Sequence, residues 1–100
     1  METEFGDWTN AQLDEDLKQI INNNLGVAIK DCDLSKNLIE DYSADALDMV
    51  EIIIDCESTF DISLPDNECE ELKGSIHKLK DLIIKYLGER YKGDTNDGNA

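Results

Sequence analysis

Apolar residues recur at helical spacing near the start of the chain. Over 10–24 they fall three or four positions apart and form one stripe: Leu13, Leu17, Ile20 and Ile21. This spacing predicts an amphipathic helix with one buried face, which Gly26 ends. The long connection 27–45 carries scattered apolar residues that can hold it to a core: Val27, Ile29, Leu34, Leu38 and Tyr42.

A second helix is predicted over 46–60, with Asp45 as its N-cap. At 100° per residue, one face gathers Met49, Ile52, Ile53, Cys56 and Phe60. Beside that core face lies a second apolar strip, formed by Leu47, Val50 and Ile54. Either two neighbouring helices cover both sets, or the second strip is a surface that binds something else.

Two further helices follow, the first of them short. Pro65 is suited to open a helix over 66–72, and Gly74 breaks it. Ser75 can cap a helix over 76–87, and Gly88 is a suitable stop. We therefore predict an all-α four-helix bundle with a short third helix and a long first connection. The domain spans 9–88, with a flexible tail at 1–8 and a disordered tail at 89–100.

Charge changes the picture of possible partners. The chain has 24 acidic and 9 basic residues, a formal net charge of −15, and 40% hydrophobic residues in 100 positions. Twelve acids and no Lys or Arg fall within 37–72. Phosphate binding needs a basic surface, so we expect neither nucleic acid nor an anionic membrane as a partner. A basic protein surface is the natural complement, although a solvated acidic face is an ordinary alternative.

The reactive residue types form no recognisable catalytic or metal pattern. Cys32, Cys56 and Cys69 have no paired spacing, and His77 is the only histidine, so we expect no metal site. There is no glycine-rich phosphate loop and no nucleophile with an evident base, so we do not expect an enzyme. No stretch is long and apolar enough to span a bilayer, and we expect a cytoplasmic monomer.

The segment 38–72 resembles the discrete, bacterial acyl carrier proteins of the fatty-acid type. The residues that carry the resemblance stand without gaps at Asp41, Asp45, Leu47, Asp48, Val50, Glu51, Ile52, Glu57, Phe60, Leu64, Pro65, Asp66 and Glu68. The resemblance extends more weakly to about residues 10–88. In the family, a serine at the start of the second helix bears 4'-phosphopantetheine. Here that position is Ala46, and Tyr42-Ser43 replaces a common Leu-Gly pair.

The resemblance implies a carrier of acyl intermediates, held as phosphopantetheine thioesters between enzymes of fatty-acid or related acyl-chain and polyketide synthesis. Its partners would be a phosphopantetheinyl transferase and acyl-transfer or synthase enzymes with basic docking surfaces. The docking residues would be Asp45, Leu47, Asp48, Val50, Glu51, Ile54 and Glu57. The slot that shelters an acyl chain would be lined by Ile62, Leu64, Cys69 and Leu72.

The methyl group of Ala46 has no oxygen to which the arm could be attached. One explanation is a serine-to-alanine change engineered into a carrier, which the otherwise intact motif favours. The other is a natural carrier-like protein that kept the docking surface and acts as a binding or regulatory partner. Ser43 lies three residues earlier in a poorly matching context, so we do not expect it to replace the missing serine.

Overall fold

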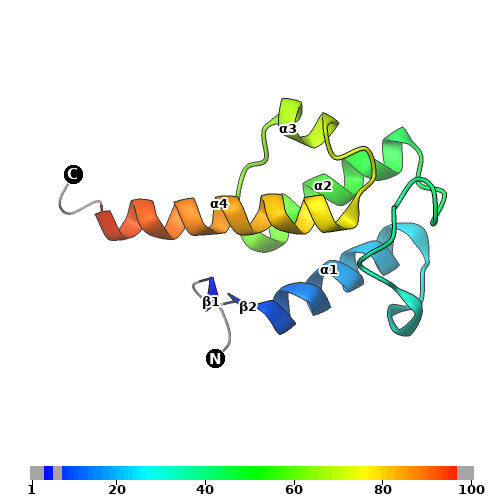
Figure 1. Cartoon of the computed structure of the whole chain (residues 1–100), viewed down its shortest axis with the longest axis horizontal. Helices are drawn as coiled ribbons and strands as arrows, with labels where there is room; N and C mark the ends of the chain where they lie inside the picture. The colour runs from blue at the N-terminus through cyan, green and yellow to red at the C-terminus, as the bar shows by residue number, and fades with distance from the viewer. Residues whose placement is uncertain (1–3, 6–7, 97–100) are drawn as a thin grey trace.

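The computed structural model describes the backbone of residues 4–5 and 8–96 and the side chains of residues 11–88 (Figure 1). A pair of short strands precedes four α-helices and one turn of 3-10 helix. The elements are β1 (Glu4–Phe5), β2 (Trp8–Thr9), α1 (Asn10–Leu25), η1 (Ile29–Asp31), α2 (Ala46–Phe60), α3 (Asp66–Glu70) and α4 (Ile76–Asn96). The predicted four-helix bundle with a short third helix is confirmed.

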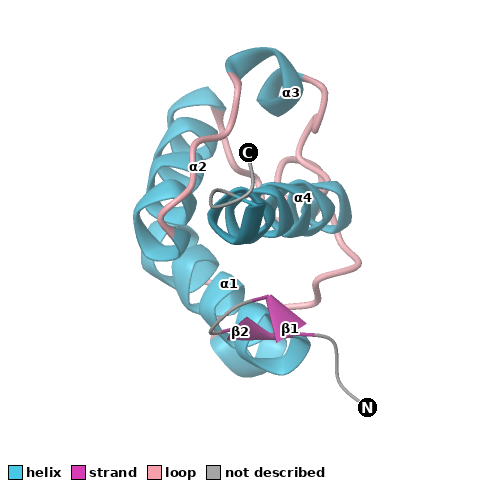
Figure 2. Ribbon diagram, turned by 90° about the vertical axis from the view of Figure 1, so that its left-hand side faces the viewer, coloured by secondary structure: helices cyan, strands magenta, loops and turns pink. Residues whose placement is uncertain are grey.

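The core lies where α1, α2 and α4 face one another, and Figure 2 shows α3 set to one side of these three helices. Apolar stripes on the three long helices supply most of the buried residues, as their spacing predicted. Leu13, Leu17 and Ile21 come from α1, Ile52, Cys56 and Phe60 from α2, and Ile76, Leu79, Ile83 and Leu87 from α4, and all are fully buried. Burial of this apolar surface is the main stabilising contribution to the fold.

The long connection between α1 and α2 is fixed to the corner between α3 and α4. The Leu38 amide donates to the Gly74 carbonyl at 2.6 Å, and the Asn37 side-chain amide donates to the Lys73 carbonyl at 3.1 Å. The Asn37 side-chain oxygen also accepts from the amides of Ile39 and Glu40 at 2.8 and 2.9 Å. Segments more than 30 residues apart therefore meet through backbone and amide hydrogen bonds, which position the start of α2.

The ends of the chain differ from the prediction. Two residues of each strand pair antiparallel, Glu4 with Thr9 and Phe5 with Trp8, within the segment that we expected to be a flexible tail. β1 lies beside α4 and β2 beside α1. Strands this short contain no detectable alternation, although the aromatic residues Phe5 and Trp8 favour them. The remaining residues of that predicted tail, 1–3 and 6–7, lie outside the described chain.

The helix α4 does not stop at Gly88 but continues to Asn96, so most of the predicted disordered tail 89–100 is helical. A glycine inside a helix costs about 1 kcal/mol relative to alanine, which the helix-forming residues after it can offset. Residues 97–100 lie outside the described chain. The short α3 ends earlier than predicted, at Glu70, because the amides of Glu71 and Leu72 bond three residues back and tighten the last turn.

Candidate functional site

The start of α2 is built by two aspartates that cap each other. The Asp48 amide donates to the Asp45 carboxylate at 2.8 Å, and the Asp45 amide donates to the Asp48 carboxylate at 3.1 Å. This reciprocal capping box satisfies two amide groups at the helix terminus. Ala46 is the first residue of the helix and is exposed, between this cap and the body of α2.

A groove of about 580 Å³ opens beside Ala46. Its walls come from α2, from α3 with the approach to it, and from the two loop corners at Ile39 and at Lys73–Gly74. Residues that line it are Ile39, Ala46, Met49, Val50, Ile53, Ile54, Glu57, Leu64, Asp66, Cys69, Glu70, Lys73 and Gly74. Most of the lining residues are apolar and the carboxylates among them are Glu57, Asp66 and Glu70, a lining that suits a flexible hydrocarbon chain more than a polar ligand.

Two of the four residues predicted to line an acyl-chain slot reach this groove, and two do not. Leu64 and Cys69 line it. Ile62 packs against the core from the loop after α2. Leu72 is buried and lines a smaller hollow of about 370 Å³ on the side of α3 that faces α4. Ile62 and Leu72 therefore do not line this groove, and their assignment to an acyl-chain slot stays a prediction.

The groove also includes residues that the sequence analysis did not select. Ile39 comes from the long connection and is exposed, and it lines the groove together with Val50 and Ile54. Met49 and Ile53, expected only in the core, are half-buried and also line the groove. Lys73 is the one cation among the described lining residues. Ile39 and Lys73 reach the site through the Asn37 hydrogen bonds, which no local pattern reveals.

The second apolar strip of α2 is uncovered. Leu47, Val50 and Ile54 retain 64%, 52% and 53% of their accessible surface. The alternative that neighbouring helices cover both apolar sets of α2 is therefore wrong. Large aliphatic side chains grouped on one exposed face are typical of a surface that binds a partner.

Carboxylates flank this strip, and they differ in whether they already accept hydrogen bonds within the protein. Glu51 is exposed on α2. Asp45 and Asp48 are engaged in the cap. The Glu57 carboxylate accepts from the Leu64 amide at 2.8 Å and so fixes the approach to α3. The acidic face thus combines residues that position the site with at least one that is available to a partner.

The thiols near the groove are poor nucleophiles. Burial raises the pKa of the Cys69 thiol, and the nearby carboxylates of Glu57, Asp66 and Glu68 raise it further. Burial also raises the pKa of Cys56, which lies in the core beneath. Thiolates are the reactive form of cysteine, so these two thiols are structural at neutral pH.

A prosthetic group attached through an ester oxygen does not fit position 46 as the chain stands. The side chain there is a methyl group, although the helix start around it is suited to a phosphate. The nearest preceding hydroxyl, on Ser43, belongs to a residue with φ of 62° and does not line the groove. The side chains described at 11–88 contain no group of three potential metal ligands. No helix in the described part of the chain is long and apolar enough to cross a membrane.

Comparisons with known proteins agree on one family. The family model described as "Phosphopantetheine attachment site" matches residues 15–83. An acyl carrier protein of Chlamydia muridarum is 38% identical over 78 residues, which cover 78% of this chain and 95% of that protein. An acyl carrier protein of Amoebophilus asiaticus is 32% identical over 80 residues, or 80% of this chain and 99% of that protein. One from Chlamydia trachomatis serovar D is 36% identical, with 78% and 95% coverage.

Proposed function

Because the chain belongs to the acyl carrier protein family, we propose that position 46 is its attachment position and that its serine form carries acyl intermediates between enzymes of fatty-acid or related acyl-chain synthesis. Members of the family are carriers rather than enzymes, their prosthetic group is 4'-phosphopantetheine, and they work with synthase and acyl-transfer enzymes. The acyl cargo and the fatty-acid or related pathway are what we propose beyond family membership.

The observation that carries the proposal is the position of Ala46. It is the exposed first residue of α2, it directly follows the Asp45 cap, and it lies at the groove that Leu64 and Cys69 line. A group attached at this position would stand at the positive end of a helix and next to an apolar groove. These are the surroundings that a phosphate and a hydrocarbon cargo each require.

With alanine at position 46, the protein would dock to partner enzymes without carrying an acyl chain. The side chain at position 46 has no oxygen for attachment, whereas the exposed apolar strip and the acidic residues of α2 do not depend on that residue. Two origins stay open: an engineered serine-to-alanine change, or a natural carrier-like protein that binds or regulates partner enzymes. The exposed strip of Leu47, Val50 and Ile54 is complete without the arm, so it supports docking under either origin.

Docking would place the acidic face of α2 against a basic surface of a phosphopantetheinyl transferase or an acyl-transfer enzyme. Charge complementarity steers association and permits rapid exchange, while the apolar strip supplies the small dry centre of the contact. We include a monomeric state and a reducing, cytoplasmic location in the proposal. The three cysteines are free thiols, which is compatible with such a compartment.

The proposal is tested by intact mass after incubation with coenzyme A and a phosphopantetheinyl transferase of broad specificity. The unaltered chain, Ala46→Ser and Ala46→Ser/Ser43→Ala are compared. We expect one phosphopantetheine on both variants that carry Ala46→Ser and none on the unaltered chain. Modification of the unaltered chain would place the site elsewhere. If Ala46→Ser stays unmodified while a control carrier is modified, the docking-only function takes precedence.

A further inference from the structure

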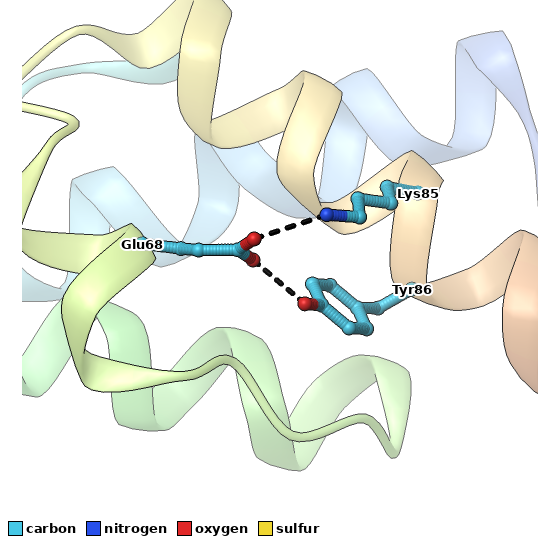
Figure 3. Close-up of polar contacts among 3 residues, drawn as sticks. All are labelled: Glu68, Lys85 and Tyr86. Carbon is cyan, nitrogen blue, oxygen red and sulfur yellow. Dashed lines mark hydrogen bonds and ion pairs between the residues drawn. The ribbon is translucent and has the colours of Figure 1, made fainter.

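The short helix α3 is held to α4 through one carboxylate. Glu68 Oε2 lies 3.0 Å from Lys85 Nζ, and the Tyr86 hydroxyl donates to Glu68 Oε1 at 2.7 Å (Figure 3). Lys85 Nζ also lies 5.1 Å from the centre of the Tyr86 ring. Both oxygens of Glu68 thus point to the same turn of α4. We call these three residues the Glu68 cluster.

The packing of α3 against the core rests on one side chain, Cys69, which is partly buried. None of its five residues, all of which the structure describes, is buried. In both views α3 stands apart from the bundle of α1, α2 and α4 (Figures 1 and 2). A helix this short is unstable without tertiary contacts, so hydrogen bonds to a charged group contribute a large share of what fixes it.

The segments on either side of α3 are fixed independently of the Glu68 cluster. Leu64 is buried and its amide donates to Glu57, and Leu72 is buried after the helix. The long helices have their own polar links: Asn24 Nδ2 donates to Asp55 Oδ2 at 2.8 Å, and Lys80 Nζ lies 2.7 Å from Asp14 Oδ1. Loss of the Glu68 contacts would therefore free the stretch between Leu64 and Leu72 while the bundle stays folded.

That stretch is also one wall of the groove beside Ala46, through Asp66, Cys69 and Glu70. We infer that Glu68, Lys85 and Tyr86 are positioning residues that hold α3 in place and thereby set access to the groove. The contacts that α3 makes with α4 would thus control how open the groove is on the other side of α3. Only the assignment of the groove to a carried chain rests on the proposed function; the positioning of α3 does not.

The thiols report movement of α3 directly. Cys69 is on α3, whereas Cys32 is buried in the long connection on another part of the molecule. Alkylation by iodoacetamide, resolved by peptide mass spectrometry, gives the ratio of the Cys69 to the Cys32 labelling rate. Global unfolding exposes both thiols, so the ratio isolates local opening of α3.

The decisive variant is Lys85→Met/Tyr86→Phe, because it breaks the contacts and leaves the Glu68 charge in place. Removing Glu68 itself would lower the pKa of the Cys69 thiol and speed labelling without any movement. Lys78→Met is the matched control, since it removes an exposed lysine of α4 whereas the ion pair of Glu68 is made with Lys85. Amide exchange of residues 66–70 provides a second readout that is independent of thiol chemistry.

We expect the ratio to rise roughly tenfold in Lys85→Met/Tyr86→Phe, the factor typical of losing hydrogen bonds to a charged group, and to change less than about twofold in Lys78→Met. Faster amide exchange confined to residues 66–70 would accompany it. An unchanged ratio and unchanged exchange would overturn the inference. If the double variant does not fold, Tyr86→Phe alone decides by the same two measurements. No coenzyme A or partner enzyme is used, so failure here and failure of the carrier proposal are separable.

Discussion

Asp45 and Asp48 each accept a hydrogen bond from the backbone amide of the other, at 2.8 and 3.1 Å. Both residues were predicted to meet a basic partner, yet in the structure their carboxylates first start the helix on which that partner would dock. Part of the acidic sequence at this site is therefore explained by folding alone.

Asp45→Ala should lower the free energy of unfolding by about 1 kcal/mol, because it removes the cap of α2. Asp45→Asn retains an acceptor for the Asp48 amide and should cost much less. Urea denaturation of the three proteins provides the measurement. Equal losses in both variants would show that the charge, and not the cap, matters at this position.

Glu51→Lys should weaken binding to a basic transferase or synthase by about fivefold at low ionic strength, with unchanged helicity. The Glu51 carboxylate is exposed on the face that the proposal assigns to docking. The same reversal at Glu15, exposed on α1, serves as the control. Surface plasmon resonance over a salt series provides the affinities. If both reversals weaken binding equally, the effect is that of net charge and not of this face.

Two isoleucines on α2 offer a matched pair, because Ile52 is fully buried and Ile54 is 53% exposed. Ile52→Ala should lower the free energy of unfolding by about 2–5 kcal/mol. Ile54→Ala should change it by less than about 0.5 kcal/mol while weakening partner binding. Chemical denaturation and a binding titration of each variant separate the two roles. A large stability loss in Ile54→Ala would mean that the strip is covered in solution.

Two glycines should respond in opposite directions to alanine. Gly74 has φ of 87°, and a Cβ there would lie 2.5 Å from Asn37 Oδ1, so Gly74→Ala should cost about 2 kcal/mol or more. Gly88 lies inside α4 with open space around it, so Gly88→Ala should add up to about 1 kcal/mol. Thermal unfolding measures both. A destabilised Gly88→Ala would contradict the continuation of α4 beyond this residue.

The stability contributed by Glu68 should depend on pH. Hydrogen bonds from Tyr86 and then Lys85 lower the pKa of this carboxyl in the folded state. A group with a lowered folded pKa stabilises the fold above its unfolded pKa, near 4.3–4.5 for glutamate, and this contribution is lost as the pH falls through the folded value. Glu68→Gln should therefore be less stable than the unaltered chain at neutral pH and converge with it in acid.

Urea denaturation at pH 7 and at successively lower pH values measures that difference. Tyr86→Phe removes the largest cause of the lowered pKa, so the pH-dependent part should shrink in that variant while Glu68 remains. A stability gap for Glu68→Gln that is constant with pH would contradict the ion-pair explanation.

Local patterns were sufficient to predict that the four helices exist and where α2 starts and ends. The spacing of Leu13, Leu17 and Ile21 predicted α1, and α2 has its predicted bounds from Ala46 to Phe60. The prediction that the last helix ends at Gly88 was wrong, since α4 continues to Asn96. A glycine ends a helix only where the backbone must turn, and nothing at this position requires a turn. A glycine that is needed for its positive φ, such as Gly74, is indistinguishable from it in sequence.

The groove was predicted only in part, since its walls depend on contacts between distant segments. Ile39 and Lys73 reach it because Asn37 joins the long connection to the turn before α4. Glu68 was selected for its place in a motif, whereas its partners Lys85 and Tyr86 lie 17 and 18 positions further on. Pairings of this kind depend on the angle between α3 and α4, which apolar periodicity does not specify.

The hydrogen bonds that join Leu38 to Gly74 and Ile76 to Lys36 have a consequence for the architecture as a whole. They bring together the two ends of the stretch 38–74, which holds the α2 cap, the exposed strip and every residue that lines the groove. This stretch is a closed loop inserted between α1 and α4. Its ends are joined by backbone hydrogen bonds, so the start of α2 and the groove keep their position relative to the turn before α4, in addition to the core that α2 shares with α1 and α4.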